Sequence, residues 1–108
     1  MQRVVFDSLP PRSPATRAAR WDRATAGMTA PLAIVDLDAF DANARSLVRR
    51  AAGKPLRVAS KSVRCADLIA RALSEPGFAG IMGFSVREAI WLVGEGFTDV
   101  FVTGMLMR

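Results

Sequence analysis

The chain is organised around the stretch RVASKSVR, residues 57–64. Pro55 and Leu56 precede it, Leu56, Val58 and Ala59 are typical of a short apolar strand, and the stretch turns polar around Lys61. Because side chains alternate along a strand, Arg57, Ala59 and Lys61 are expected to share one face. A helix is expected from about residue 63 to residue 73. Lys61 is therefore predicted to lie at the carboxyl end of a strand, beside the start of a helix.

A lysine in this position has two interpretations. In the first, Lys61 is a solvated surface residue, as most lysines are. In the second, its amine is partly desolvated and flanked by the cations Arg57 and Arg64, which favour the neutral form that Schiff-base chemistry requires. The spacing alone does not choose between the two.

Apolar runs elsewhere in the chain predict three more strands. They are expected at residues 32–37, 78–84 and 99–103. The first helix between strands is expected to start at Asp38 or Asp41 and to end at Gly53. Another is expected to be capped by Ser85, with Glu88 completing a capping box. Strands and helices that alternate in this way form βαβ units, so the sequence predicts an α/β protein with a parallel sheet.

Three segments resemble one family of enzymes. IVDLDAF, residues 34–40, followed by Asn43, is similar to the opening strand and helix of alanine racemase-type barrels. Residues 57–64 resemble the segment that carries the pyridoxal phosphate lysine, with the Arg-x-x-x-Lys-Ser/Thr-x-basic spacing of the D-threonine aldolase and D-serine dehydratase branch. Residues 83–89 together with 94–97 resemble the third strand, helix and exit turn of the same fold.

The resemblance covers roughly residues 29–104, with the three segments in matching order and spacing. It favours the amino-acid deaminase and aldolase group, related to D-threonine aldolase, over the true racemases. The chain also departs from that pattern. Ala59 and Val63 stand where the aldolase branch often has histidine, and the chain has no histidine.

The resemblance implies the amino-terminal portion, about four βα units, of a pyridoxal phosphate-binding TIM-type (β/α)8 barrel. A complete barrel needs about 250 residues, whereas this chain has 108. The chain is therefore expected to be the amino-terminal fragment of a longer protein. Residues 1–28 are expected to be an extension, and residues 29–108 the truncated barrel.

The implied function is that of a pyridoxal phosphate enzyme acting on amino acids by aldol cleavage, deamination or racemisation, with D-amino or 3-hydroxy amino acids as substrates. Lys61 would be the catalytic residue, joined to the cofactor as a Schiff base. Arg57, Thr103 and Gly104 would be further cofactor contacts. A divalent metal, if used, would be held by residues outside this chain, and the longer protein could be a homodimer. The 108-residue chain alone is expected to be inactive.

Two other classes of function stay open. One is a non-catalytic pyridoxal phosphate carrier, which would bind the cofactor and turn over no amino acid. The other is a small α/β interaction domain in which the motif match is accidental.

Composition limits the partners and the setting. The net charge is +5, but the basic residues are spread along the chain without a block of five, so nucleic acid is not expected as a partner. No apolar run approaches the ~20 residues that span a bilayer. A single cysteine, Cys65, excludes an internal disulfide and suits the cytoplasm. No metal site is expected from this chain alone.

Some residues carry two interpretations each. Asp36 and Asp38 could form a catalytic carboxylate pair, but capping and hydrogen bonding at the barrel rim are favoured. Cys65 could approach the cofactor, although core packing is favoured. Before the barrel, residues 4–6 are expected to form a strand, and a helix is expected to start at Ser13 and Pro14.

Overall fold

The computed structural model describes residues 13–103. They belong to two compact units, Met1–Asp38 and Ala39–Arg108, which we describe separately. The predicted strand at residues 4–6 and the predicted cofactor contact Gly104 lie outside the described residues. The boundary expected after residue 28 stays a prediction.

The first unit contains helix α1 (Pro14–Thr25), which starts where the sequence predicts. Ser13 is its N-cap, and the Ser13 hydroxyl accepts a hydrogen bond from the backbone N–H of Thr16 at 3.4 Å. Pro14 follows at the first helical turn, where its missing N–H costs nothing.

The strand predicted at residues 32–37 is wrong. Residues 32–36 have no regular secondary structure, and Leu37 is already helical. Leu32, Ile34 and Val35 are between 42% and 50% exposed. The physical reason is that an apolar run becomes a strand only where a neighbouring strand pairs with it, and the described part of this unit contains none.

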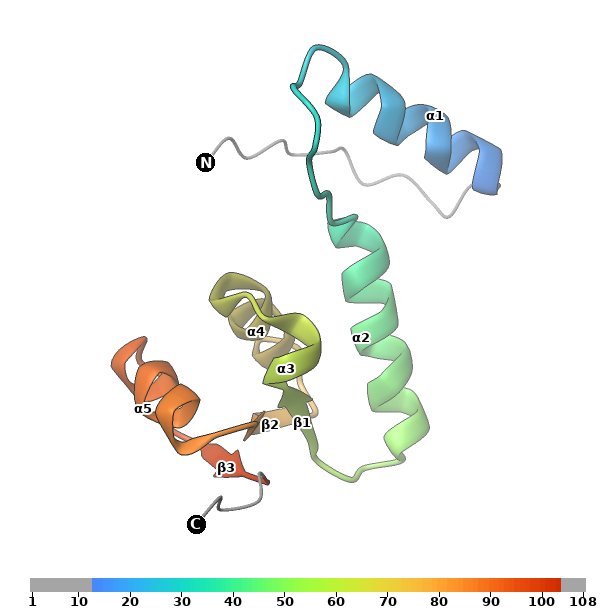
Figure 1. Cartoon of the computed structure of the whole chain (residues 1–108). Coiled ribbons are helices and arrows are strands. Elements are labelled where there is room, and N and C mark those ends of the chain that lie inside the picture. Colours follow the sequence, from blue (N-terminus) through green and yellow to red (C-terminus); the bar gives the residue numbers. More distant parts are fainter. Residues whose placement is uncertain (1–12, 104–108) are drawn as a thin grey trace. The chain divides into compact units, whose positions relative to one another are not determined.

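The second unit carries the sheet (Figure 1). Helix α2 (Leu37–Ala51) leads into it and is followed by the remaining elements in chain order. They are β1 (Leu56–Ala59), α3 (Ser60–Val63), α4 (Ala66–Leu73), β2 (Phe78–Gly83), α5 (Val86–Gly94) and β3 (Val100–Val102).

The sheet is three-stranded and parallel, in the order β1-β2-β3. This confirms the α/β class and the strands predicted at the lysine stretch, at 78–84 and at 99–103. Helices α4 and α5 pack on the sheet and bury one of its faces. The buried core consists of Val58, Ile69, Ala72, Ile81 and Leu92. It provides the rigid base from which the end of β1 projects.

The helix predicted at residues 63–73 is divided in two. Helix α3 is a single turn that begins at Ser60, and Arg64 ends it in the left-handed conformation with φ +49°. Cys65 is extended, and α4 begins at Ala66. Lys61 therefore lies inside a one-turn helix and not on the strand itself.

The other face of the sheet has no helix over it in the described part of the unit. Because side chains alternate along strands, Arg57 on β1, Met82 on β2 and Phe101 on β3 point to this side. Met82 is 37% exposed and Phe101 57% exposed. We call these three residues, together with Gly80, the open face.

Candidate functional site

Lys61 lies at the carboxyl end of β1, where α3 turns the chain away from the sheet. Its side chain is exposed, and Nζ lies 5.8 Å from the centroid of the Phe84 ring. Phe84 follows β2 directly, so the lysine from one strand end lies over an aromatic ring from the next. An ammonium is attracted to the face of such a ring, and this contact gives the lysine a preferred direction.

Arg64 brings a second cation to the same strand end. Its backbone N–H donates to the carbonyl of Ser60 at 2.8 Å and closes the single turn of α3. Its side-chain Nε donates to the carbonyl of Lys61 at 3.0 Å. The guanidinium is therefore folded back onto the backbone of the lysine that precedes it by three residues.

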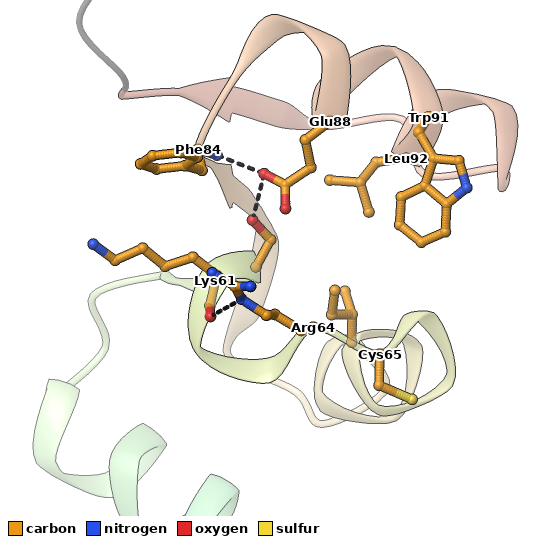
Figure 2. A pocket seen from close by; sticks show the side chains of 9 residues that line it. Lys61, Arg64, Cys65, Phe84, Glu88, Trp91 and Leu92 are labelled. Atoms are coloured by element: carbon orange, nitrogen blue, oxygen red, sulfur yellow. Dashed lines mark hydrogen bonds between the residues drawn. The ribbon is translucent and has the colours of Figure 1, made fainter.

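A groove of about 410 Å³ runs between α5 and the α3–α4 segment. Figure 2 shows Trp91 and Leu92 on one side of it and Arg64 and Cys65 on the other. The lining residues are Ser60, Lys61, Arg64, Cys65, Ile69, Phe84, Glu88, Trp91 and Leu92. A volume in this range and a mainly apolar wall with a few charged groups are typical of small-molecule sites.

Glu88 connects the two strand ends beside the groove. Its Oε2 accepts a hydrogen bond from the hydroxyl of Ser60 at 2.9 Å and another from the backbone N–H of Phe84 at 2.6 Å. The backbone N–H of Glu88 donates to the hydroxyl of Ser85 at 3.2 Å, as the capping box predicts. The carboxylate, however, binds the N–H of Phe84 and not that of the cap residue itself.

The sequence pattern predicts a capping role for Glu88 and does not place it near Lys61. Ser60 falls in the polar stretch around Lys61, yet it is only 1% exposed. The signal available in the sequence was the Ser-x-x-Glu spacing after β2. That spacing fixes where the carboxylate lies along α5, but only the parallel pairing of β1 with β2 brings Ser60 to it.

Arg57, a predicted cofactor contact, points toward a different part of the sheet. Its Nη1 donates to Oδ1 of Asp99 at 2.7 Å, and its guanidinium lies 5.8 Å from the centroid of the Phe101 ring. Asp99 immediately precedes β3, whereas Lys61 follows β1. The structure therefore brings Arg57 toward the amino end of the sheet and does not place it beside the lysine.

Thr103, another predicted contact, lies at the carboxyl end of β3. Its backbone N–H donates to the carbonyl of Gly83 at 3.2 Å and extends the pairing with β2. Thr103 and Phe84 are thus both at the carboxyl edge of the sheet, and Thr103 is exposed there.

The remaining candidates are Asp36, Asp38 and Cys65. In the first unit, Oδ2 of Asp36 accepts from Arg20 at 2.7 Å and from the indole N–H of Trp21 at 3.0 Å. Hydrogen bonding is the interpretation of Asp36 that the sequence analysis favours over a catalytic pair with Asp38. Asp38 lies in the first turn of α2. Cys65 is half-buried on the wall of the groove and is not a member of the buried core.

Comparison with protein-family models, with curated proteins and with solved structures finds no match. Across residues 13–103, no group of three or more metal-ligating side chains comes together. None of the helices in that range is long and apolar enough to cross a membrane.

Proposed function

We propose that this chain is the amino-terminal part of a pyridoxal phosphate-dependent enzyme that acts on amino acids through Lys61. The observation that carries the proposal is the placement of the lysine. Lys61 is an exposed amine at the carboxyl end of a parallel strand, it lies over an aromatic ring, and it lines a groove that contains a second cation. In α/β folds the carboxyl edge of the sheet is where ligands bind.

The residues present fit the cofactor on three counts. The groove volume of about 410 Å³ is large enough for a substituted pyridine ring and part of a substrate. Phe84, 60% exposed, offers a flat apolar surface to such a ring. Arg64 contributes a guanidinium, which favours an anionic ligand.

In this proposal Lys61 has two tasks. Lys61 would hold pyridoxal phosphate covalently through Nζ, with one water lost between the amine and the cofactor's aldehyde. Once a substrate amine had taken its place on the cofactor, Nζ of Lys61 would accept or return a proton at the substrate α-carbon. The bound cofactor supplies the electron sink that makes this carbon acidic.

The finer features of the proposal are those that the resemblance implies. They are a TIM-type barrel, aldol cleavage, deamination or racemisation as the reaction, and cofactor contacts from Thr103 and Gly104; Arg57, which pairs with Asp99, is not kept as a contact. A homodimeric longer protein, a divalent metal held outside this chain and a cytoplasmic setting belong to the same proposal. The open face of the sheet supports the barrel, because the inner face of a barrel is covered by the strands opposite.

The experiment that tests the proposal is to map where pyridoxal phosphate attaches. The chain contains two lysines, Lys54 and Lys61, so the labelling of Lys54 is the internal reference for the labelling of Lys61. The protein is incubated with the cofactor, reduced with borohydride, digested and analysed by mass spectrometry. We expect the label on Lys61 in clear excess over Lys54. Equal labelling of the two lysines would contradict the proposal.

A small α/β interaction domain is the second candidate, and the open face favours it. Phe101 is more than half exposed and Met82 more than a third, and because the two are paired on neighbouring strands they form one exposed apolar surface. An interaction domain predicts no preference for Lys61 in the mapping experiment. A non-catalytic carrier would share the labelling of Lys61 but would turn over no amino acid.

A further inference from the structure

We propose that Glu88 is a positioning residue for Lys61. One carboxylate oxygen holds both the residue that precedes the lysine and the residue whose ring lies under its ammonium. This inference rests on the proposed role of Lys61, and it extends that role to a residue that the sequence pattern places only in a helix cap.

The first contact of the Glu88 carboxylate is with Ser60. Its hydroxyl is at hydrogen-bond distance from Oε2 of Glu88, at 2.9 Å, and from the carbonyl of Met82, at 3.2 Å. A hydroxyl has one proton to donate, and donation to a charged carboxylate gives the stronger bond. Because Ser60 is 1% exposed, water is not available as a substitute partner. The backbone immediately before Lys61 is therefore fixed to α5.

The second contact of the Glu88 carboxylate is with Phe84. The backbone N–H of Phe84 donates to the same Oε2 at 2.6 Å, a short, charge-assisted bond. This bond fixes the backbone from which the aromatic ring projects. Since Nζ of Lys61 lies over that ring, the carboxylate determines both where the lysine starts and where its amine comes to rest.

The long side chain of lysine makes this restraint matter. A lysine has several rotatable bonds and explores many conformers unless its surroundings restrict it. Reaction with an aldehyde needs the Lys61 amine at one place in the groove. Fixing the backbone at Ser60 and the ring of Phe84 raises the fraction of time that the amine spends at that place. Figure 2 shows the Glu88 side chain extending from α5 toward the lysine segment, with dashed lines for its two hydrogen bonds.

The test measures the initial labelling of Lys61 relative to Lys54 by pyridoxal phosphate and borohydride, in the full chain. Ser60→Ala and Glu88→Ala each remove one side of the arrangement, and we expect the Lys61:Lys54 ratio to fall about tenfold. Ser60→Thr keeps the hydroxyl and Glu88→Gln keeps an acceptor oxygen, so both are expected to retain most of the ratio.

A matched control separates positioning from loss of stability. Ile81→Val removes a methylene from the core without touching Ser60, Phe84 or Glu88, and it should leave the ratio unchanged. Circular dichroism melts are recorded for every variant. If Glu88→Ala does not fold, Ser60→Ala against Ser60→Thr decides the question.

The outcomes keep the two proposals apart. Preferential labelling of Lys61 in the original chain, with the ratio unchanged in folded Ser60→Ala and Glu88→Ala, would overturn the role of Glu88 and leave that of Lys61 standing. A fall in the ratio as large in Ile81→Val as in Ser60→Ala would also overturn it. Equal labelling of the two lysines in the original chain would defeat the proposed function itself.

Discussion

Gly80 makes room for the ion pair that spans the sheet. Its φ is +82°, and a Cβ added there would overlap the Arg57 guanidinium and the Asp99 carboxylate. The register of β1 against β2 shifts at this level, between Leu56 and Val58. A glycine is thus needed here for two separate reasons, backbone conformation and space.

We expect Gly80→Ala to lower the free energy of unfolding by about 1–3 kcal/mol, because a left-handed residue with a Cβ costs about 1–2 kcal/mol and displacement of the exposed ion pair adds up to about 1 kcal/mol. The measurement is chemical denaturation. Gly53→Ala is the matched control, since Gly53 has φ +86° and no atom within 4 Å of an added Cβ. Equal losses in the two variants would show that crowding at the ion pair contributes nothing.

At the scale of elements, Asp41 and Arg71 join α2 to α4. Nε and Nη2 of Arg71 donate to the two carboxylate oxygens of Asp41 at 2.7 and 2.6 Å, a bidentate pair. The hydrogen bond from Arg71 lowers the pKa of Asp41 below its usual value, although partial burial acts in the opposite direction. The pair therefore stabilises the fold only while Asp41 is ionised.

This pair predicts a pH-dependent effect of Asp41→Asn. The folded-state pKa of Asp41 lies below the unfolded value of 3.8, so the stabilisation is complete above about pH 4 and is lost as the pH falls through the folded pKa. We expect the variant to be less stable than the original chain by about 1 kcal/mol or less at pH 7, because both side chains are about one-third exposed. The difference should shrink as denaturation is repeated at lower pH.

A double-mutant cycle provides the control for that prediction. In an Arg71→Gln background, Asp41→Asn should have little further effect at pH 7, because its partner is already gone. A full effect of Asp41→Asn in that background would assign the stabilisation to another neighbour of Asp41.

The elements also show how far the sequence could be used for prediction. Helix α1, the three strands of the sheet and the Ser85 cap follow from local signals, because each depends on residues close in the chain. The prediction of a strand at residues 32–37 was wrong because a strand needs a neighbouring strand to pair with. The apolar run itself does not show whether such a neighbour exists. The single helix at 63–73 failed because Arg64 adopts a left-handed conformation, with φ +49°, that nothing in an arginine predicts.

The candidate site divides in the same way. Lys61 at a strand end was predictable from the polar turn after β1. Its contact with Phe84 and the hydrogen bonds of Glu88 depend on how β1 and β2 are paired, which no local pattern contains. Arg57 was expected near the lysine from strand alternation, but its guanidinium reaches across the sheet to Asp99 because an ion pair is available there.

At the scale of the whole molecule, the sheet has one buried and one open face, and substitutions should reflect this. Ile81 is fully buried, so Ile81→Ala is expected to cost about 2–5 kcal/mol of unfolding free energy. Phe101→Ala on the open face should cost less than about 1 kcal/mol, since the ring is already 57% exposed. Denaturant melts of the two variants give the comparison, and similar losses would mean that the open face is covered in solution.

Whether Lys61 binds the cofactor can be measured by an absorbance titration of the chain with pyridoxal phosphate. We expect a new band from the C=N bond in the original chain, its retention in Lys54→Ala, and its loss in Lys61→Ala. Retention of the band in Lys61→Ala, or its equal loss in the two variants, would contradict the assignment of Lys61 as the residue that binds the cofactor.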